Sequence, residues 1–212
     1  NFGPVMVNPG VRVDWFKMDY IDKTAQEYTN PHNSQATVSP KLNITWDATR
    51  NFRLLLKAGK GFHSNDARVV VIEKDLPTLP SSWGVDFGFK WKPLKGLTFA
   101  AMGWFLHSNQ EMVYVGDEAV VEPGGRTRRL GLDLGLRYEF LKDFYFQCDY
   151  TYSHARSIDD PKGQNYVPLA PVNTLVAALT WNHNGFAASA KTRWLSNRPA
   201  NEDYSLTADG YC

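Results

Sequence analysis

The stretch RRLGLDLGLRYEF, residues 128–140, alternates polar and apolar residues almost without error. After a break at Leu141-Lys142-Asp143, the alternation resumes in FYFQCDYTYS, residues 144–153. A strict period of two places leucines and aromatic rings on one face of a strand pair and charged residues on the other. Such an apolar face is too large for a hairpin to leave in water, and about ten residues is the length of a tilted strand that crosses hydrocarbon. The stretch therefore predicts two strands of an all-β protein, a transmembrane antiparallel β-barrel.

The composition favours a barrel over other membrane folds. The chain is 43% hydrophobic with a mean hydropathy of −0.40, and its longest apolar run, Phe99 to Leu106, is too short for a spanning helix of ~20 residues. A barrel interleaves lipid-facing and lumen-facing residues, so its mean hydropathy stays low while aromatic residues rise, here to 14%. A soluble β-sandwich is the alternative all-β class.

The charge, the cysteines and the N-terminus set further limits. The net charge is +1, and no basic stripe suggests a nucleic-acid partner. We expect Cys148 to lie on the apolar face and Cys212 is the last residue, so a disulfide is not expected. An outer-membrane barrel needs an export signal, and none is present, so we expect the N-terminal part to be missing.

Further alternating segments follow one another at even spacing, and each is expected to be a strand. They are Val5 to Tyr20, Thr37 to Trp46, Phe52 to Phe62, Trp83 to Lys92, Leu97 to His107, Arg128 to Phe140, Phe144 to Ala155, Asn173 to Trp181 and Phe186 to Leu195, with a tenth beginning near Ser205. Tight turns rich in Asn, Asp, Gly and Pro alternate with long connections. This asymmetry is typical of outer-membrane barrels, whose long loops lie outside the cell.

The long connection Ser108 to Thr127 contains two β-prone runs, Met112 to Val115 and Ala119 to Val121, joined by Gly116-Asp117-Glu118. We expect a hairpin there that continues the flanking strands. Pro123-Gly124-Gly125 is expected to break the pairing.

Aromatic residues are expected in two rows at the strand ends. The row beside the short turns comprises Trp46, Phe52, Trp91, Phe140, Phe144, Trp181 and Phe186. The row near the long connections comprises Trp15, Phe62, Trp83, Phe105, Tyr152 and Trp194. Two such belts are what amphipathic rings form at the two membrane interfaces.

The long connections resemble those of a known family. The segments are GFHSNDAR (61–68), EMVYVGDE (111–118), EPGGRTRR (122–129), YVPLAP (166–171) and RPANED (198–203). Their order and spacing resemble the barrel of TonB-dependent outer-membrane receptors over nearly the whole chain. The resemblance implies a barrel of about 22 strands filled by a plug, with uptake driven through the TonB protein. About nine to ten of those strands would be present, so residues 1–212 would be a partial barrel without its plug domain and last strands, unable to transport alone.

No catalytic constellation stands out, so no enzyme activity and no cofactor are expected. A hydrolase assembled from loop residues stays open as an alternative. His63, His107 and His154 fall at outer strand ends, where they could contact a metal chelate, although His is also an ordinary interfacial residue. Asn65, Asp66 and Arg68 could touch a ligand, but internal hydrogen bonds and ion pairs of the loop are the more economical interpretation. No dedicated metal site is predicted.

Charged residues of both signs are expected to face the lumen. They are Lys41, Arg53, Lys57, Asp86, Lys90, Arg129, Asp133, Arg137, Glu139, Asp149, Lys191 and Arg193. A water-filled porin would use such a lining for ion selectivity, and a plugged receptor would use it to hold the plug. Residue types alone do not separate the two, and the family resemblance favours the plug.

The sequence thus predicts part of an outer-membrane receptor that imports a scarce solute. The resemblance implies a metal chelate such as a ferric siderophore, haem or cobalamin as the solute. The implied partners are outer-membrane lipid, the receptor's own plug and the TonB complex, reached through the missing N-terminal part. A self-contained ten-stranded barrel, acting as a passive pore, adhesin or membrane enzyme, is the alternative.

Overall fold

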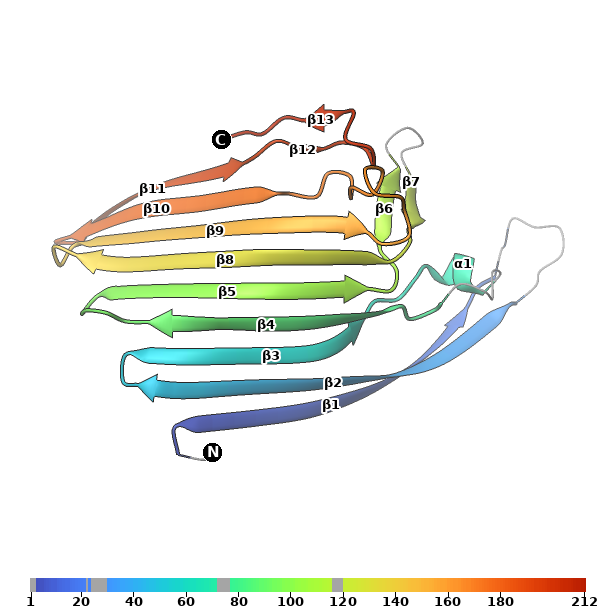
Figure 1. Cartoon of the computed structure of the whole chain (residues 1–212), viewed down its shortest axis with the longest axis horizontal. Helices are drawn as coiled ribbons and strands as arrows, with labels where there is room; N and C mark the ends of the chain where they lie inside the picture. The colour runs from blue at the N-terminus through green and yellow to red at the C-terminus, as the bar shows by residue number, and fades with distance from the viewer. Residues whose placement is uncertain (1–2, 22, 24–29, 72–76, 116–119) are drawn as a thin grey trace.

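The computed structural model describes residues 3–21, 23, 30–71, 77–115 and 120–212, and the side chains of 68–69, 112–115 and 120–123 lie outside the described part. Nine strands form one antiparallel sheet in the order β1-β2-β3-β4-β5-β8-β9-β10-β11 (Figure 1). Their bounds are β1 (Val5–Asp19), β2 (His32–Thr49), β3 (Phe52–Phe62), β4 (Ser81–Trp91), β5 (Leu97–Ser108), β8 (Thr127–Phe140), β9 (Phe144–Ser157), β10 (Asn173–His183) and β11 (Phe186–Leu195). The prediction of an all-β protein with about nine antiparallel strands is therefore confirmed.

Smaller elements occupy the connections. The helix α1 (Ala67–Val70) lies between β3 and β4. The strand β6 (Met112–Val115) pairs with β7 (Val120–Pro123), and β12 (Arg198–Pro199) pairs with β13 (Thr207–Ala208). No helix within the described residues has the length and apolarity needed to cross a membrane.

The short connections all lie at one end of the sheet, as predicted, and the long ones at the other (Figure 1). Two of the short turns use left-handed backbone conformations: Leu141 and Lys142 have φ of 49° and 58°, and Asn184 and Gly185 have φ of 46° and 85°. Positive φ at consecutive positions gives a turn whose twist matches that of the strands it joins. These turns fix the register of β8 with β9 and of β10 with β11.

The register gives the sheet two chemically distinct faces. Residues directly opposite each other on antiparallel strands share a face, so the pairings can be followed from strand to strand. One rung runs through Leu56, Phe87 and Gly103 to Leu132, and another through Phe89 and Ala101 to Leu134. We call this side the apolar face and the opposite side the polar face. Both predicted aromatic rows have the parity of the apolar face, where Phe140 and Phe144 stack with ring centroids 5.5 Å apart, but Phe62 packs edge-on against Phe16, which has the parity of the polar face (5.7 Å).

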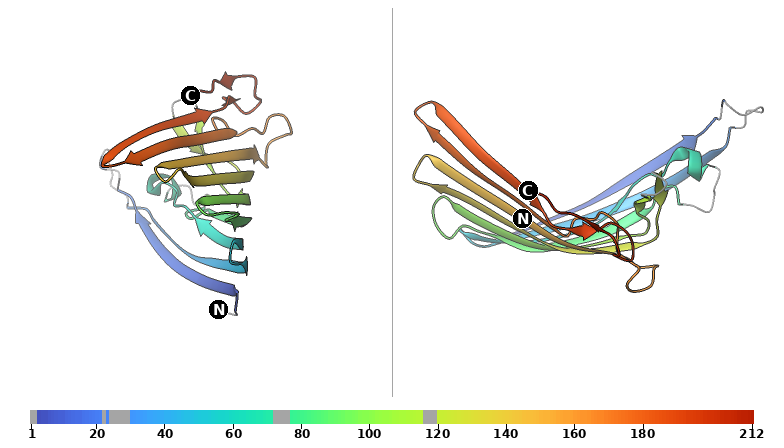
Figure 2. Two further views of the ribbon diagram at one scale, coloured as in Figure 1. Left: turned by 90° about the vertical axis from the view of Figure 1, so that its left-hand side faces the viewer. Right: turned by 90° about the horizontal axis from the view of Figure 1, so that it is seen from above.

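The sheet is curved into a trough, with β1 and β11 at its edges, and α1 lies on its concave side (Figure 2). The segment that carries α1 hydrogen-bonds to the polar face of β2. The Asn33 side chain donates to the Val70 carbonyl (3.1 Å), and the Leu79 N–H donates to the Gln35 side chain (3.0 Å). Asn33, Gln35 and Lys41 have the same parity on β2, so the polar face is the concave one.

β2 is longer than predicted, because it begins at His32 rather than Thr37. Its first residues pair only with β1, while the pairing of β2 with β3 stops at Lys41 and Gly59. β1 and β2 therefore leave the sheet as a two-stranded ribbon. The α1 segment fills the resulting wedge with the fully buried Val70 and Val71.

Two predictions about the long connections need correction. The hairpin β6–β7 forms and keeps the register of β5 and β8, since Ser108 lies opposite Thr127 and Met112 opposite Pro123, but it bends away from the direction of these strands (Figure 1). Its pairing also passes Pro123, which lies opposite Met112, because a proline at an edge position needs no partner for its missing N–H. The predicted link Gly116-Asp117-Glu118 lies outside the described residues.

Near Ser205 only the two-residue strand β13 begins, and it pairs with β12 instead of adding a tenth strand to the nine-stranded sheet. Ser205 lies in a turn, where its N–H and hydroxyl both donate to the Asp203 carboxylate. The chain returns to the edge of β11 only at Tyr211, which exchanges two backbone hydrogen bonds with Leu195 (2.9 and 3.0 Å). Both Cys148 and Cys212 are free.

Candidate functional site

The polar face carries all the charged residues that the alternation assigned to the lumen. By register these are Lys41, Arg53, Lys57, Asp86, Lys90, Arg129, Asp133, Arg137, Glu139, Asp149, Lys191 and Arg193. They come from strands β2 to β11 and share the concave side. The candidate site is therefore a wall of mixed charge rather than a compact cluster.

Some of these charges are neutralised within the wall. The Nη2 of Arg137 donates to both oxygens of the Asp149 carboxylate (2.8 and 2.9 Å), and its Nη1 donates to the Leu136 carbonyl (2.9 Å). Thr151 donates to Asp133 (2.8 Å). Near the short turns, Arg53 pairs with Asp47 (2.5 Å), a residue that the sequence reasoning did not single out. These pairs stiffen the wall.

Other charges on the polar face have no ion-pair partner among the described residues. They are Lys41, Lys57, Asp86, Lys90, Glu139, Lys191 and Arg193. Lys57 lies opposite Asp86 in the register without forming an ion pair. A face with unpaired charges of both signs can bind another polar surface or water.

Glycines shape the same face. Trp104 covers Gly131 on the neighbouring strand, so that a Cβ there would collide with the indole ring. The Lys41 side chain lies in the same way over Gly10. In the middle of the wall, Lys90, Met102, Asp133 and other side chains surround a hollow of about 390 Å³.

The end with the long connections holds most of the buried side chains. Asn65 is only 7% exposed and donates to the Pro77 carbonyl (2.7 Å) and to Gln110 (2.6 Å), which joins two connections that are far apart in sequence. The Asp66 carbonyl caps α1 by accepting from the Val70 N–H (3.1 Å). His63 is half-buried, and its Nε2 has no partner among the described residues. Arg68 lies in α1, and its side chain is outside the described part.

The three predicted histidines are not brought together. His107 and His154 lie on the apolar face, opposite Arg128 and Leu130 respectively, whereas His63 follows β3 and turns into the loop. In the part of the chain that the structure describes, no group of three or more His, Cys, Asp or Glu could hold a metal ion. These histidines therefore do not form a joint site.

Two ion pairs that the sequence reasoning missed hold the long connections. Arg126 donates from its backbone N–H (2.7 Å) and its guanidinium (2.5 Å) to Asp159. These hydrogen bonds lower the pKa of the Asp159 carboxyl below its usual value. Arg129 pairs with Glu111, which also accepts from Thr127 (2.5 Å). Only proximity in space could reveal these pairs, because their members lie 33 and 18 residues apart.

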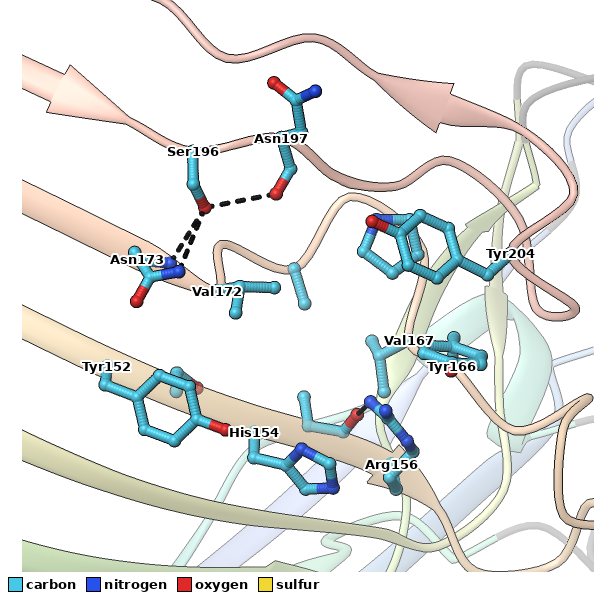
Figure 3. Close-up of a pocket in the computed structure, with 14 residues that line it drawn as sticks. Tyr152, His154, Arg156, Tyr166, Val167, Val172, Asn173, Ser196, Asn197 and Tyr204 are labelled. Atoms are coloured by element: carbon cyan, nitrogen blue, oxygen red, sulfur yellow. Dashed lines mark hydrogen bonds between the residues drawn. The ribbon is translucent and has the colours of Figure 1, made fainter.

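A cavity of about 430 Å³ lies beside the end of β9, between the connections that follow β9 and β11 (Figure 3). Its aromatic part is formed by Tyr152, Tyr166 and Tyr204, the last two with ring centroids 5.1 Å apart. The Arg156 guanidinium lies 3.8 Å from the centroid of the Tyr166 ring. Asn173 and Ser196 supply hydrogen-bonding groups on the opposite side (Figure 3).

The comparisons with known proteins agree with this architecture. The family model for the TonB-dependent receptor-like β-barrel matches residues 1–212. No curated protein matches the sequence. Among solved structures, the unliganded ferric citrate transporter FecA gives a TM-score of 0.82 at 15% identity and covers 100% of this chain and 34% of its own. The siderophore receptor PiuA from Acinetobacter baumannii gives 0.74 at 14% identity, covering 98% of this chain and 33% of its own.

A third similar structure is the ferric yersiniabactin uptake receptor FyuA from Yersinia pestis, with a TM-score of 0.75 at 12% identity, covering 99% of this chain and 34% of its own. The chain spans about a third of the length of these structures. At such low identity the likeness shows the fold. The family and these neighbours are receptors and transporters, so the expectation that the chain is not an enzyme is confirmed. With its full length matched by the family model and its wall superimposable on known receptor barrels, the chain belongs to the TonB-dependent receptor β-barrel family.

Proposed function

We propose that the chain is part of the wall of an outer-membrane receptor that imports a scarce solute by TonB-dependent active transport. The observation that carries this proposal is the concave polar face, with unpaired charges of both signs on one side of a wall whose other side is apolar. In an outer-membrane barrel the apolar face meets lipid and the long connections lie outside the cell. In this chain the long connections lie together at one end of the sheet, where most of the buried side chains are found.

The unpaired charges of the polar face support a plug inside the barrel. Lys41, Lys57, Asp86, Lys90 and Lys191 would pair with side chains of a plug domain supplied by another part of the receptor. The pairs already closed within the wall, such as Arg137 with Asp149, would keep that surface rigid. The TonB complex would act on the plug and not on this wall.

The proposed solute is a metal chelate such as a ferric siderophore, haem or a cobalamin. Three similar structures are named for ferric citrate, ferric yersiniabactin and copper, which supports a metal-bearing cargo. Among the residues predicted to contact the ligand, we propose that His63, Asn65, Asp66 and Arg68 lie at the mouth. The register gives no such support to His107 and His154, because both lie on the apolar face.

An uptake assay with the full-length receptor tests this function. The receptor would be produced in otherwise receptor-deficient cells with and without TonB, and entry of iron-55 would be measured with a panel of ferric siderophores and with haem, and entry of cobalt-57 with cobalamin. We expect saturable uptake of at least one chelate that is lost without TonB. Uptake that does not depend on TonB would instead indicate a passive pore.

A charge-reversal variant tests the plug contact. Lys41→Glu together with Lys90→Glu should increase leakage of a large hydrophilic antibiotic through the full-length receptor. Both changes replace a positive charge on the polar face by a negative one, which would repel the plug side chains that pair with the lysines. Lys95→Glu with Lys142→Glu, at the short turns, is the matched control. Equal leakage in both variants would contradict a role of the wall charges in holding a plug.

A further inference from the structure

The strand β5 carries apolar side chains on the polar face of the sheet. Four successive positions with the parity of that face are apolar, and we call them the β5 stripe: Ala100, Met102, Trp104 and Leu106. In the part of the chain that the structure describes, no other strand of the sheet has four apolar residues in succession on this face. β5 is the fifth of nine strands, so the stripe runs along the middle of the concave wall (Figure 1).

Glycines on the neighbouring strands make room for the β5 stripe. Each of its three long side chains lies over a glycine of an adjacent strand. The pairs are Met102 with Gly88 and Leu106 with Gly84 on β4, and Trp104 with Gly131 on β8. An added Cβ at Gly88 would lie only 2.9 Å from the Met102 Sδ. Because these side chains lie flat on the wall, another chain can approach the stripe closely.

Charged residues border the β5 stripe opposite the glycines. At each level of the register, one neighbour of the stripe residue is a glycine and the other is charged. The charged neighbours, from the short turns to the long connections, are Lys90, Asp133, Asp86 and Arg129. Lys90 and Asp86 form no ion pair within the described residues. An apolar centre with a polar rim is the usual composition of a protein–protein interface.

The length of the β5 stripe favours a protein surface as its partner over a small solute or water. Six residue steps of ~3.4 Å separate Ala100 from Leu106, so the stripe is about 20 Å long. A cavity that holds a small ligand is only about 7 to 10 Å across, because its volume is roughly 300–1,000 Å³. A lumen filled with water would be lined by polar residues. The chain spans about a third of the length of the similar structures, which leaves room for a partner domain within the same receptor.

We propose that the β5 stripe is an apolar anchor for the plug, an inference that rests on the plug contact proposed above. The plug would place an apolar surface on Met102 and Trp104, with a cation near Asp86 and an anion near Lys90. The hollow of about 390 Å³ beside Met102 and Lys90 would take an aromatic side chain of the plug. A few well-packed apolar residues at the centre of an interface supply most of its binding energy, while charges at its rim set the orientation.

Oxidative footprinting of the purified full-length receptor tests whether the stripe is covered. Hydroxyl radicals from a short pulse would be followed by mass spectrometry of the oxidised peptides. Met102 and Trp104 should be oxidised at least about tenfold more slowly than in the urea-unfolded receptor, because side-chain oxidation follows exposure. Oxidation of both residues at nearly the unfolded rate would overturn the proposal.

Substitutions in the stripe test whether its apolar character holds the plug. In Met102→Gln/Trp104→Gln, amide hydrogen exchange of plug peptides in the full-length receptor should be about tenfold faster than in the wild type, because the plug loses its anchor. Met102→Leu/Trp104→Phe keeps the stripe apolar and should keep exchange close to that of the wild type. The matched control is Thr180→Gln/Ser189→Gln, which adds two amide side chains on the same face away from the stripe and should leave exchange unchanged.

Heat-modifiable migration on gels would verify that the barrel of every variant is folded. Equal exchange of the plug in the wild type and in Met102→Gln/Trp104→Gln would reject the anchor. Faster exchange of the barrel strands together with the plug would assign the stripe to the stability of the sheet and would also reject it. Uptake with and without TonB is measured separately. A receptor can import a chelate in a TonB-dependent way while the stripe stays open to water, so the anchor can fail without the proposed transport.

Discussion

At the scale of single residues, adjacent positions on a strand of this wall meet different surroundings. On β8, Asp133 accepts a hydrogen bond from Thr151, while Leu134 lies opposite Ala101 and Tyr150 on the apolar face. In the proposed outer-membrane placement, parity alone decides which of the two meets lipid. Residue type and position are therefore tightly coupled along each strand.

A matched pair of substitutions tests this assignment. Leu134→Arg should lower the free energy of unfolding in lipid vesicles by ~2 to 4 kcal/mol, because it places a cation near the middle of the hydrocarbon. Asp133→Arg, one residue away, should cost well under ~2 kcal/mol, since the polar face tolerates charge. Urea titration of the full-length receptor measures both, and equal costs would reject the face assignment.

The ion pair between Arg126 and Asp159 predicts a response to acid. The pKa of Asp159 is lowered by its hydrogen bonds to Arg126, so the contact is fully present above the ordinary aspartate pKa of 3.8 and is lost as the pH falls through the lower folded value. We expect pepsin cleavage within 158–165 of the full-length receptor to stay slow near pH 4 and to accelerate at lower pH.

Arg126→Gln should bring fast cleavage already near pH 4, because the carboxyl then loses its guanidinium partner. Asp160→Asn is the control, since this exposed neighbour makes no ion pair within the described residues. If Arg126→Gln left the pH profile of cleavage unchanged, the pair would have no part in holding this connection.

At the scale of elements, alternation predicted the strands well where one face of the sheet is apolar and the other polar. β3 matches its predicted bounds, and β8 and β9 differ by one or two residues. The start of β2 was missed because Asn33 and Gln35 belong to the ribbon that leaves the sheet, where their side chains bond to the α1 segment. The residues of this ribbon therefore need not alternate between polar and apolar types.

Contacts between strands could not be predicted from the sequence, for a different reason. The polar residues of each strand were assigned to the right face, yet the alignment of His107 with Arg128 depends on the register of two strands. The pairs of Arg126 with Asp159 and of Asn65 with Gln110 join connections whose folds have no periodicity. A pattern within one strand contains no information about either.

The hairpin β6–β7 is expected to support the mouth of the receptor. Glu111 beside it pairs with Arg129 and accepts from Thr127, which ties the base of the hairpin to β8. Deleting residues 112–121 should therefore reduce surface display of the full-length receptor by more than it alters ligand choice. Flow cytometry with an epitope tag and the uptake panel measure the two effects. A variant that is displayed normally but imports a different chelate would make the hairpin a specificity element.

At the scale of the whole molecule, the sheet of nine strands has two open edges at β1 and β11. Unpaired backbone groups are costly in hydrocarbon, and exposed edges promote aggregation. Residues 1–212 expressed alone should therefore aggregate or require denaturant, as judged by size-exclusion chromatography in detergent. A monodisperse, heat-resistant monomer would favour the self-contained barrel.

The short connections at one end also bear on how the wall is built. Each joins two strands that are neighbours in the sheet, so β2–β3, β4–β5, β8–β9 and β10–β11 are units whose contacts are local in sequence. Local contacts close quickly because little chain entropy is lost in forming them. Each hairpin can therefore form before it docks on its neighbours, so the wall can be built from pre-paired units of two strands rather than from single strands.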